Sequence, residues 1–398
     1  MSIDIDLLKL ITNDYKDNIY IDYSDEDSII DLSEEIVFIY FIIYDDCKDI
    51  INYKKKLLKI VKELILEVYK PIVKPILYTE EDIEKLTNQI LELKKVKQPE
   101  QRTPEWHTFR NNRLTASDLG TALSKNKYAN RKSLIAKKCG HEVPFIQGVA
   151  ITHGVKYEDV AVKIYEIRNN VNIHEYGCIP HPTIEYFGAS PDGICHYDSQ
   201  NKNYIGRMLE IKCPKSRPIT GIIPEHYELQ VQGQLEVCNL LYCDYLECSI
   251  KEYENVYEFS NDSNTETTKN INMTKDKNEK GVIVELYDTI NKKNVYKYLY
   301  TFDSLEEIQK WEETEIEKIY ESDTYEYIGT TYWYLEKYSC VLVLRDIERF
   351  EKIKEDIKLF WEDVLKYREI GYESLITKKK REKKKFNTNE LMFLPDSS

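Results

Sequence analysis

Helix-like and strand-like segments alternate between residues 103 and 250, and this order constrains the fold more than any other feature of the chain. Apolar residues at helical spacing predict helices over 131–139, 154–168 and 224–237. Strand-like composition is found over 171–179, 186–189, 207–212 and 242–250. The order predicts an α/β fold in which helices flank a central mixed sheet.

A helical region precedes this core. Residues 1–100 carry apolar side chains at helical spacing, and one helix is expected to begin near Thr79, where three acidic residues suit the positive end of a helix. We therefore expect an N-terminal helical domain over 1–100. The core region, 101–252, should open with a helix that has Thr103 as its N-cap and Pro104 in its first position.

Composition changes again after residue 252. The segment 253–330 is acidic and polar, which predicts a solvated insertion, with a hairpin as one option for part of it. Residues 331–377 are expected to complete the core with two short strands over 332–344 and an amphipathic helix over 345–367. The tail, 378–398, has a basic run that fits either a flexible solvated tail or a nuclear-targeting or phosphate-binding patch.

The overall charge restricts how the chain can bind nucleic acid. Acidic residues number 70 against 56 basic ones, so the net charge is −14 and the molecule as a whole repels DNA at long range. A DNA-binding surface must therefore be local. The longest apolar run, from Ile36 to Tyr44, is less than half of the ~20 residues that a membrane-spanning helix needs, so no membrane association is expected.

The nine cysteines indicate reduced thiols in an intracellular protein. Their number is odd, no two form a C-x-x-C pair, and no secretory signal opens the chain. Cys238, Cys243 and Cys248 are evenly spaced, but their apolar surroundings favour small core residues over zinc ligands. Zinc is therefore not predicted.

Two short motifs, SPDG at 190–193 and LEIK at 209–212, carry the strongest chemical signal. On a strand, Glu210 and Lys212 project from one face while the residue between them faces the other side. If Asp192 ends the neighbouring strand, two carboxylates and one ammonium converge, and the carboxylates suit Mg²⁺ with positions open for substrate phosphate. The lysine cation would then help to activate water and to stabilise transition-state charge. Glu-x-Lys alone is common on surface strands.

Several separated motifs together match one family in order. They are Trp106-x-x-x-Arg110-x-x-Arg113-Leu114-Thr115-Ala116-Ser117, then His153-Gly154-x-x-x-Glu158, then the two motifs above, and finally Tyr227-x-x-Gln230-x-Gln232. From Trp106 to about Ile250 the chain resembles the YqaJ-like viral recombinase family, relatives of the phage lambda-type exonuclease within the PD-(D/E)XK superfamily. The segment from Trp333 to Trp361 resembles the end of that family's domain.

The resemblance implies roles for individual residues. Arg110 and Ser117 would bind the terminal 5′-phosphate of the strand being degraded, with help from Ser190, since a guanidinium fork and hydroxyl donors suit a phosphate. Glu158 would face the metal site from its helix. Gln230 would help to place the attacking water or the substrate. Each of these residues has an alternative role as an ordinary polar surface residue.

The strand pattern and the family resemblance together predict the residues of the metal centre. The expected metal ligands are Asp192, Glu210, Glu158 and the backbone carbonyl of Ile211, with Mg²⁺ as the ion and Mn²⁺ as a substitute. Lys212 and Gln230 complete the catalytic set. The resemblance also implies that the core has the PD-(D/E)XK restriction-endonuclease-like fold.

The leading hypothesis is a Mg²⁺-dependent exonuclease, 5′ to 3′ on double-stranded DNA ends, that serves viral DNA recombination, repair or replication in the host cytoplasm or nucleus. A structure-specific or restriction-like endonuclease is the nearest alternative, because fold and metal centre do not fix the geometry of the DNA. A DNA-binding or scaffolding protein with a vestigial site is a third hypothesis, against which the full Asp, Glu and Lys set argues. Expected partners are DNA ends, a single-strand-annealing or other recombination protein, and further copies of the chain.

Overall fold

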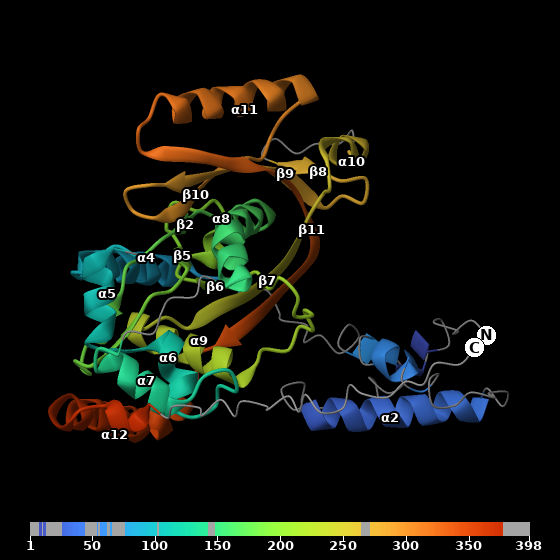
Figure 1. Cartoon of the computed structure of the whole chain (residues 1–398). Helices are drawn as coiled ribbons and strands as arrows, with labels where there is room; N and C mark the ends of the chain where they lie inside the picture. Colours follow the sequence, from blue (N-terminus) through green and yellow to red (C-terminus); the bar gives the residue numbers. More distant parts are fainter. Residues whose placement is uncertain are drawn as a thin grey trace, which may run out of the picture.

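The computed structural model of the chain describes residues 8–9, 11–12, 26–43, 54, 56–61, 64–65, 76–101, 103–141, 148–263 and 271–376. An eight-stranded mixed sheet lies at its centre, in the order β10-β9-β11-β7-β6-β5-β2, with β8 paired to β9 (Figure 1). Its strands are β2 (Ile173–His174), β5 (Gly193–Cys195), β6 (Met208–Lys212), β7 (Tyr242–Glu252), β8 (Asn272–Met273), β9 (Glu279–Asp288), β10 (Lys293–Leu299) and β11 (Tyr325–Leu344). Among the described strand pairs of this sheet, β6 with β7 is the single parallel pair.

A second, three-stranded sheet consists of β1 (Leu114–Thr115), β4 (Phe187–Ala189) and β3 (Ile179–Pro180). The described helices are α2 (Glu26–Ile43), α4 (Glu80–Lys95), α5 (Pro104–Asn111), α6 (Ala116–Ala122), α7 (Arg131–Lys138), α8 (Val149–Asn169), α9 (Glu225–Cys238), α10 (Val256–Asn261), α11 (Leu305–Tyr320) and α12 (Ile347–Ile370). Two short 3-10 helices, Lys202–Tyr204 and Glu373–Leu375, complete the described elements.

The central sheet is covered on both faces. Strand β6 shows the division, because Met208 packs into a core with α6, α9 and α12, whereas Leu209 and Ile211 pack into a second core with α8. Alternate residues of a strand face opposite sides, so Glu210 and Lys212 share the face of Met208. The sheet thus presents its polar pair toward α9.

Helix starts follow the expected capping chemistry. The Thr79 hydroxyl accepts from the backbone N–H of Asp82 and forms a capping box at the start of α4. The Thr103 hydroxyl accepts from the backbone N–H of Trp106, with Pro104 in the first turn of α5. Both helix starts expected from the sequence are confirmed.

The helices expected within the core are confirmed, although α8 begins at Val149 rather than near 154. The strand expected over 171–179 divides into β2 and β3, which belong to different sheets. The two short strands expected over 332–344 are wrong, because this stretch lies within the single long strand β11. A solvated insertion over 253–330 is also wrong for β9, where Val282, Ile283 and Val284 are fully buried. The basic run of 378–398 lies outside the described residues.

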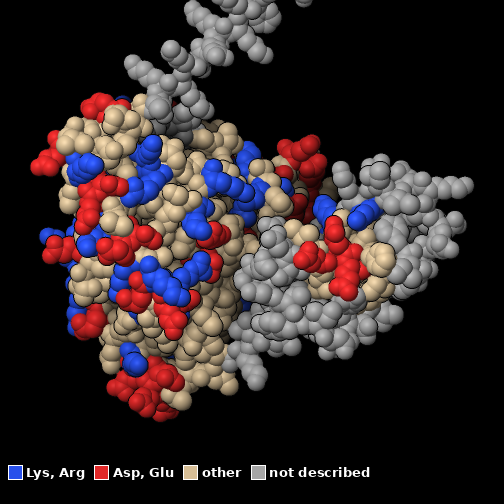
Figure 2. Space-filling model, turned by 90° about the horizontal axis from the view of Figure 1, so that it is seen from below, with Lys and Arg blue, Asp and Glu red and all other residues tan. Residues whose placement is uncertain are grey.

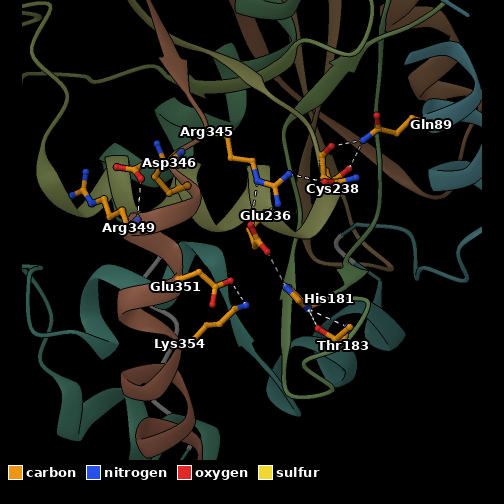
Figure 3. A network of polar contacts seen from close by, with 12 residues as sticks. Gln89, His181, Thr183, Glu236, Cys238, Arg345, Asp346, Arg349, Glu351 and Lys354 are labelled. Atoms are coloured by element: carbon orange, nitrogen blue, oxygen red, sulfur yellow. Dashed lines mark hydrogen bonds and ion pairs between the residues drawn. The ribbon is translucent and has the colours of Figure 1, made fainter. Parts of the chain in front are cut away.

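A polar network holds α9 against the junction of β11 and α12 (Figure 3). Arg345 donates to Oε2 of Glu236 through Nη2 at 2.6 Å and through Nε at 3.1 Å, and to Oδ1 of Asn239 at 2.6 Å. The amide of Gln232 donates to the backbone oxygen of Leu344 at 2.8 Å. These bonds fix the helix that faces Glu210.

Among the helices that the structure describes, none combines the length and the apolar character needed to cross a membrane.

Candidate active site

Asp192, Glu210 and Lys212 meet at one end of the central sheet. Asp192 directly precedes β5, whose Gly193 pairs with Leu209 of β6. The backbone N–H of Ile211 donates to Oδ2 of Asp192 at 2.7 Å, and the ammonium of Lys212 donates to Oε1 of Glu210. The three residues expected to converge are therefore together.

The glycine of the SPDG motif has a packing reason. A Cβ added to Gly193 would lie 2.2 Å from Cγ2 of Ile173 on β2. Real Cβ atoms essentially never approach another atom so closely, so a larger residue at position 193 would require the Ile173 side chain to shift.

The two carboxylates repel each other. Burial raises the pKa of Asp192 well above its usual value, and the charges of Glu210 and Glu158 raise it further against the opposing effect of Lys212. Burial lowers the pKa of Lys212, but the charges of Glu210 and Asp192 outweigh burial and raise it overall. Lys212 is therefore a stable cation within a cluster rich in negative charge.

Two glutamines of α9 hold the carboxylate of Glu210, which is 1% exposed. The amide of Gln230 donates to Oε1 at 2.6 Å, and the amide of Gln234 donates to Oε2 at 2.7 Å. The helical spacing of four residues places Gln230 and Gln234 on one face, but the sequence-based prediction included only Gln230. The structure adds Gln234 as a second contact to Glu210.

Glu158 lies on α8, which covers the other face of the sheet. Burial is the main cause of the raised pKa of Asp192 and of Cys213, and the charge of Glu158 raises both further. Glu158 is therefore within electrostatic range of the centre. The thiol of Cys213 donates to the backbone oxygen of Tyr157 at 3.5 Å, which ties the end of β6 to this part of α8.

The donor set fits a hard divalent cation. Asp192 and Glu210 contribute two carboxylates, Glu158 adds negative charge within electrostatic range of Asp192, and the ammonium of Lys212 donates to Glu210. Oxygen donors with unbalanced negative charge are what Mg²⁺ and Mn²⁺ prefer. The buried oxygen Oε1 of Gln234 has no hydrogen-bond partner, which leaves an acceptor available beside the carboxylates.

The residues expected to bind a terminal phosphate, Arg110, Ser117 and Ser190, form a second group. Nη2 of Arg110 donates to the hydroxyl of Ser117 at 2.9 Å, and the guanidinium lies 4.3 Å from the ring centroid of Trp106. The indole N–H of Trp106 donates to the hydroxyl of Ser190 at 3.2 Å. Trp106 therefore links Ser190 to Arg110 and Ser117, a role that the sequence did not reveal.

Another group of potential metal ligands lies apart from this site. His174, His196 and Asp198 offer ligand atoms within 4.8 Å of one another. The two imidazole rings are stacked, with centroids 3.7 Å apart and planes at 10°. Ring-nitrogen lone pairs lie in the ring planes, so those of stacked rings run parallel and do not converge on one ion. Lys94 also donates to Nδ1 of His174 at 3.1 Å and to Nε2 of His196 at 2.7 Å.

The surface charge is mixed. On the face shown in Figure 2, Lys and Arg side chains lie interspersed with Asp and Glu. A net charge of −14 with such mixing gives no long-range attraction for DNA on that face. Recognition of nucleic acid then depends on local groups such as Arg110.

Three solved structures resemble the chain weakly. An alkaline exonuclease from Laribacter hongkongensis, LHK-Exo, is 20% identical to this chain. Its TM-score is 0.39 for the complex with dAMP and 0.38 for a second structure. Each match covers 67% of this chain and 95% of the LHK-Exo chain. A phage related exonuclease from Haemophilus somnus 129PT is 12% identical, with a TM-score of 0.34, and covers 66% of this chain and 96% of its own. Scores below 0.5 carry no assignment.

Among curated proteins, uncharacterized protein R354 of Acanthamoeba polyphaga mimivirus is 34% identical over 304 residues. The match covers 70% of this chain and 54% of the relative, so the chain spans about half the length of that protein.

The model of one protein family matches residues 105–240, described as the YqaJ-like viral recombinase domain. This range contains every expected site residue, from Arg110 to Gln230. The part of the chain that brings Asp192, Glu210 and Lys212 together therefore matches the model of the YqaJ-like viral recombinase domain.

Proposed function

We propose that the protein is a Mg²⁺-dependent exonuclease that hydrolyses phosphodiester bonds from the 5′ ends of double-stranded DNA. One observation carries the proposal: Asp192, Glu210 and Lys212 meet at a sheet end within a YqaJ-like domain. Mn²⁺ is expected to substitute for Mg²⁺, because both accept oxygen ligands.

Asp192, Glu210, Glu158 and the backbone carbonyl of Ile211 would hold the ion. The cation would supply positive charge to the phosphate oxygens as the phosphodiester is attacked. Lys212, which stays protonated at neutral pH, would stabilise the negative charge of the transition state and orient the attacking water. Gln230 would fix the carboxylate of Glu210 and help to place the substrate.

The group of Arg110, Ser117 and Ser190 favours an exonuclease over an endonuclease. A bidentate guanidinium beside hydroxyl donors suits a terminal phosphate. An enzyme that cuts within a duplex has no use for such a pocket. We expect this activity to serve viral DNA recombination, repair or replication in the host cytoplasm or nucleus. The candidate partners are an annealing or other recombination protein and further copies of the chain.

The test compares three duplex substrates that are labelled uniformly: linear with 5′-phosphates, linear with 5′-hydroxyls, and covalently closed circular. With Mg²⁺ we expect nucleotide release from the phosphorylated linear duplex, slower release from the hydroxyl form and none from the circle. Release at equal rates by the wild type and Asp192→Ala would end the enzyme proposal. Nicking or linearisation of the circle would favour the endonuclease alternative instead.

A matched control keeps the test specific. Asp159 follows Glu158 on α8 and is exposed. Glu158→Gln should lower the rate at limiting Mg²⁺ and recover part of it at high Mg²⁺, whereas Asp159→Asn should behave as the wild type. An identical Mg²⁺ dependence in both variants would remove Glu158 from the metal site.

A further inference from the structure

A buried ion pair lies beside the group of Arg110 and Ser117. Lys138, the last residue of α7, is only 4% exposed, and its Nζ lies 2.9 Å from Oδ2 of Asp118 on α6. The same ammonium donates to the backbone oxygen of Arg110 at 2.9 Å. One cation therefore contacts both the helix that carries Arg110 and the helix that carries Asp118.

Hydroxyl groups connect this ion pair to Ser117. Thr115 donates its hydroxyl hydrogen to Oδ2 of Asp118 at 3.0 Å, and its oxygen lies 3.1 Å from that of Ser117. Since Thr115 has a single hydroxyl hydrogen, Ser117 must be the donor in their contact. Ser117 in turn accepts from Arg110 at 2.9 Å. Asp118 therefore draws the hydrogen of Ser117 away from any anion bound by Arg110.

Asp118 opposes an anion in two ways, through its own charge and through the direction of these hydroxyl groups. Burial would raise the pKa of Asp118, but the charges of Lys138 and Lys137 keep it below its usual value, so the carboxylate is ionised at neutral pH. A buried carboxylate without a partner would repel phosphate strongly. Lys138 is the cation in direct contact that compensates it.

We propose that Lys138 and Asp118 set the charge of the pocket at Arg110 and Ser117, and that Lys138 is the positioning residue on which discrimination between 5′-phosphate and 5′-hydroxyl ends depends. The inference rests on the proposed function, because it presupposes a terminal phosphate in this pocket.

The test measures KM and kcat on linear duplexes with either 5′ end, for the wild type, Lys138→Met, Asp118→Asn and the double variant. Lys138→Met should raise KM for the phosphorylated duplex about tenfold or more, with a smaller effect on kcat. Asp118→Asn should lower that KM, because the uncompensated Lys138 then attracts phosphate. The double variant, which removes both charges, should regain most of the wild-type preference.

Lys132→Met is the matched control, since it removes a lysine charge from an exposed position of the same helix. Its preference for phosphorylated ends should stay within about twofold of the wild type. Thermal melting of each variant reports folding, and Asp118→Asn tests the proposal even if Lys138→Met does not fold.

Two results would overturn the inference. One is a folded Lys138→Met variant with the wild-type preference. The other is a KM for phosphorylated ends that Asp118→Asn raises instead of lowering. A wild type without any preference would overturn the proposed phosphate pocket itself and this inference with it, so the two failures are distinguishable.

Discussion

The amide of Gln234 donates to Oε2 of Glu210 at 2.7 Å, on the opposite side of the carboxylate from the contact that Gln230 makes with Oε1 at 2.6 Å. A carboxylate held at both oxygens keeps one orientation. Gln234 is thus a positioning residue for the expected metal ligand, one helical turn beyond the residue that the sequence singled out.

Gln234→Ala should lower activity by roughly 10- to 100-fold, the range typical for groups that orient a metal ligand. Gln234→Glu should be worse, because it places a second negative charge against Glu210. Steady-state kinetics as a function of Mg²⁺ concentration, together with the Mg²⁺ affinity from calorimetry, are the measurements.

Gln232→Ala is the control for this position. Its amide bonds the backbone of Leu344 rather than Glu210, so the variant should lose stability while its Mg²⁺ affinity stays unchanged. A Gln234→Ala variant with wild-type Mg²⁺ affinity and rate would contradict the positioning role.

Asp192→Asn should make the protein more stable and inactive. The substitution removes repulsion with Glu210 and Glu158, while the amide oxygen of the new side chain still accepts from the backbone N–H of Ile211. We expect a gain of about 1 kcal/mol in the free energy of unfolding without divalent cations. Added Mg²⁺ should then raise the melting temperature of the wild type but not of the variant. Equal Mg²⁺ stabilisation of both proteins would exclude Asp192 as a ligand.

The stacked pair of His174 and His196 predicts a loss of stability in mild acid. An ammonium has only donors, so the ring nitrogens that face Lys94 must be unprotonated. Burial lowers the pKa of His174 below its ordinary value of 6.5, and His196 and Lys94 lower it further, against the charge of Asp198. The unfolded chain therefore binds the proton more tightly, and stability is complete above pH 6.5 and falls as the pH drops below it.

Urea unfolding between pH 8 and pH 5 measures this loss. Lys94→Met should be less stable than the wild type at pH 8 by about 1 kcal/mol, because it loses two hydrogen bonds, yet show a shallower decline toward pH 5. The decline will not vanish, because burial also lowers the pKa values of His153, His181 and His226. A decline of equal slope in both proteins would contradict the role of Lys94.

The network of Figure 3 predicts unequal costs for two neighbouring arginines. Arg345 and Glu236 have side chains that are 11% and 12% exposed, so Arg345→Met should cost about 3 kcal/mol by leaving a largely buried carboxylate without its partner. Arg349 pairs with Glu228 nearer the surface, and Arg349→Met should cost less than about 1 kcal/mol. Denaturant unfolding measures both, and equal costs would contradict the prediction.

Local patterns in the sequence were enough to predict that Asp192, Glu210 and Lys212 lie together. Period-two alternation puts Glu210 and Lys212 on one face, and a single register, Gly193 against Leu209, brings Asp192 to them. The ion pair of Lys138 and Asp118 could not be predicted from the sequence, because it depends on how two helices pack. No spacing of residues in the chain indicates that contact.

The full extent of the sheet could not be predicted from the sequence for a different reason. Strand β11 shifts register against β9 between Tyr327 and Gly329, and against β7 between Leu335 and Lys337. Each shift reverses which side chains face inward, so one long strand has the hydrophobic pattern of shorter pieces. Strand β9 could not be recognised in the sequence, because polar, Asn- and Lys-rich residues surround its short apolar run.

Strand β11 pairs with β9 through its first half and with β7 through its second half. The outer hairpin of β9 and β10 and the strands around the candidate active site are therefore joined by one continuous strand. Deletion of the hairpin would leave the first half of β11 without its partner strand and would open an edge on the remaining sheet. The region after residue 252 is thus not a detachable module, and a shortened chain would need a redesigned β11 rather than a simple excision.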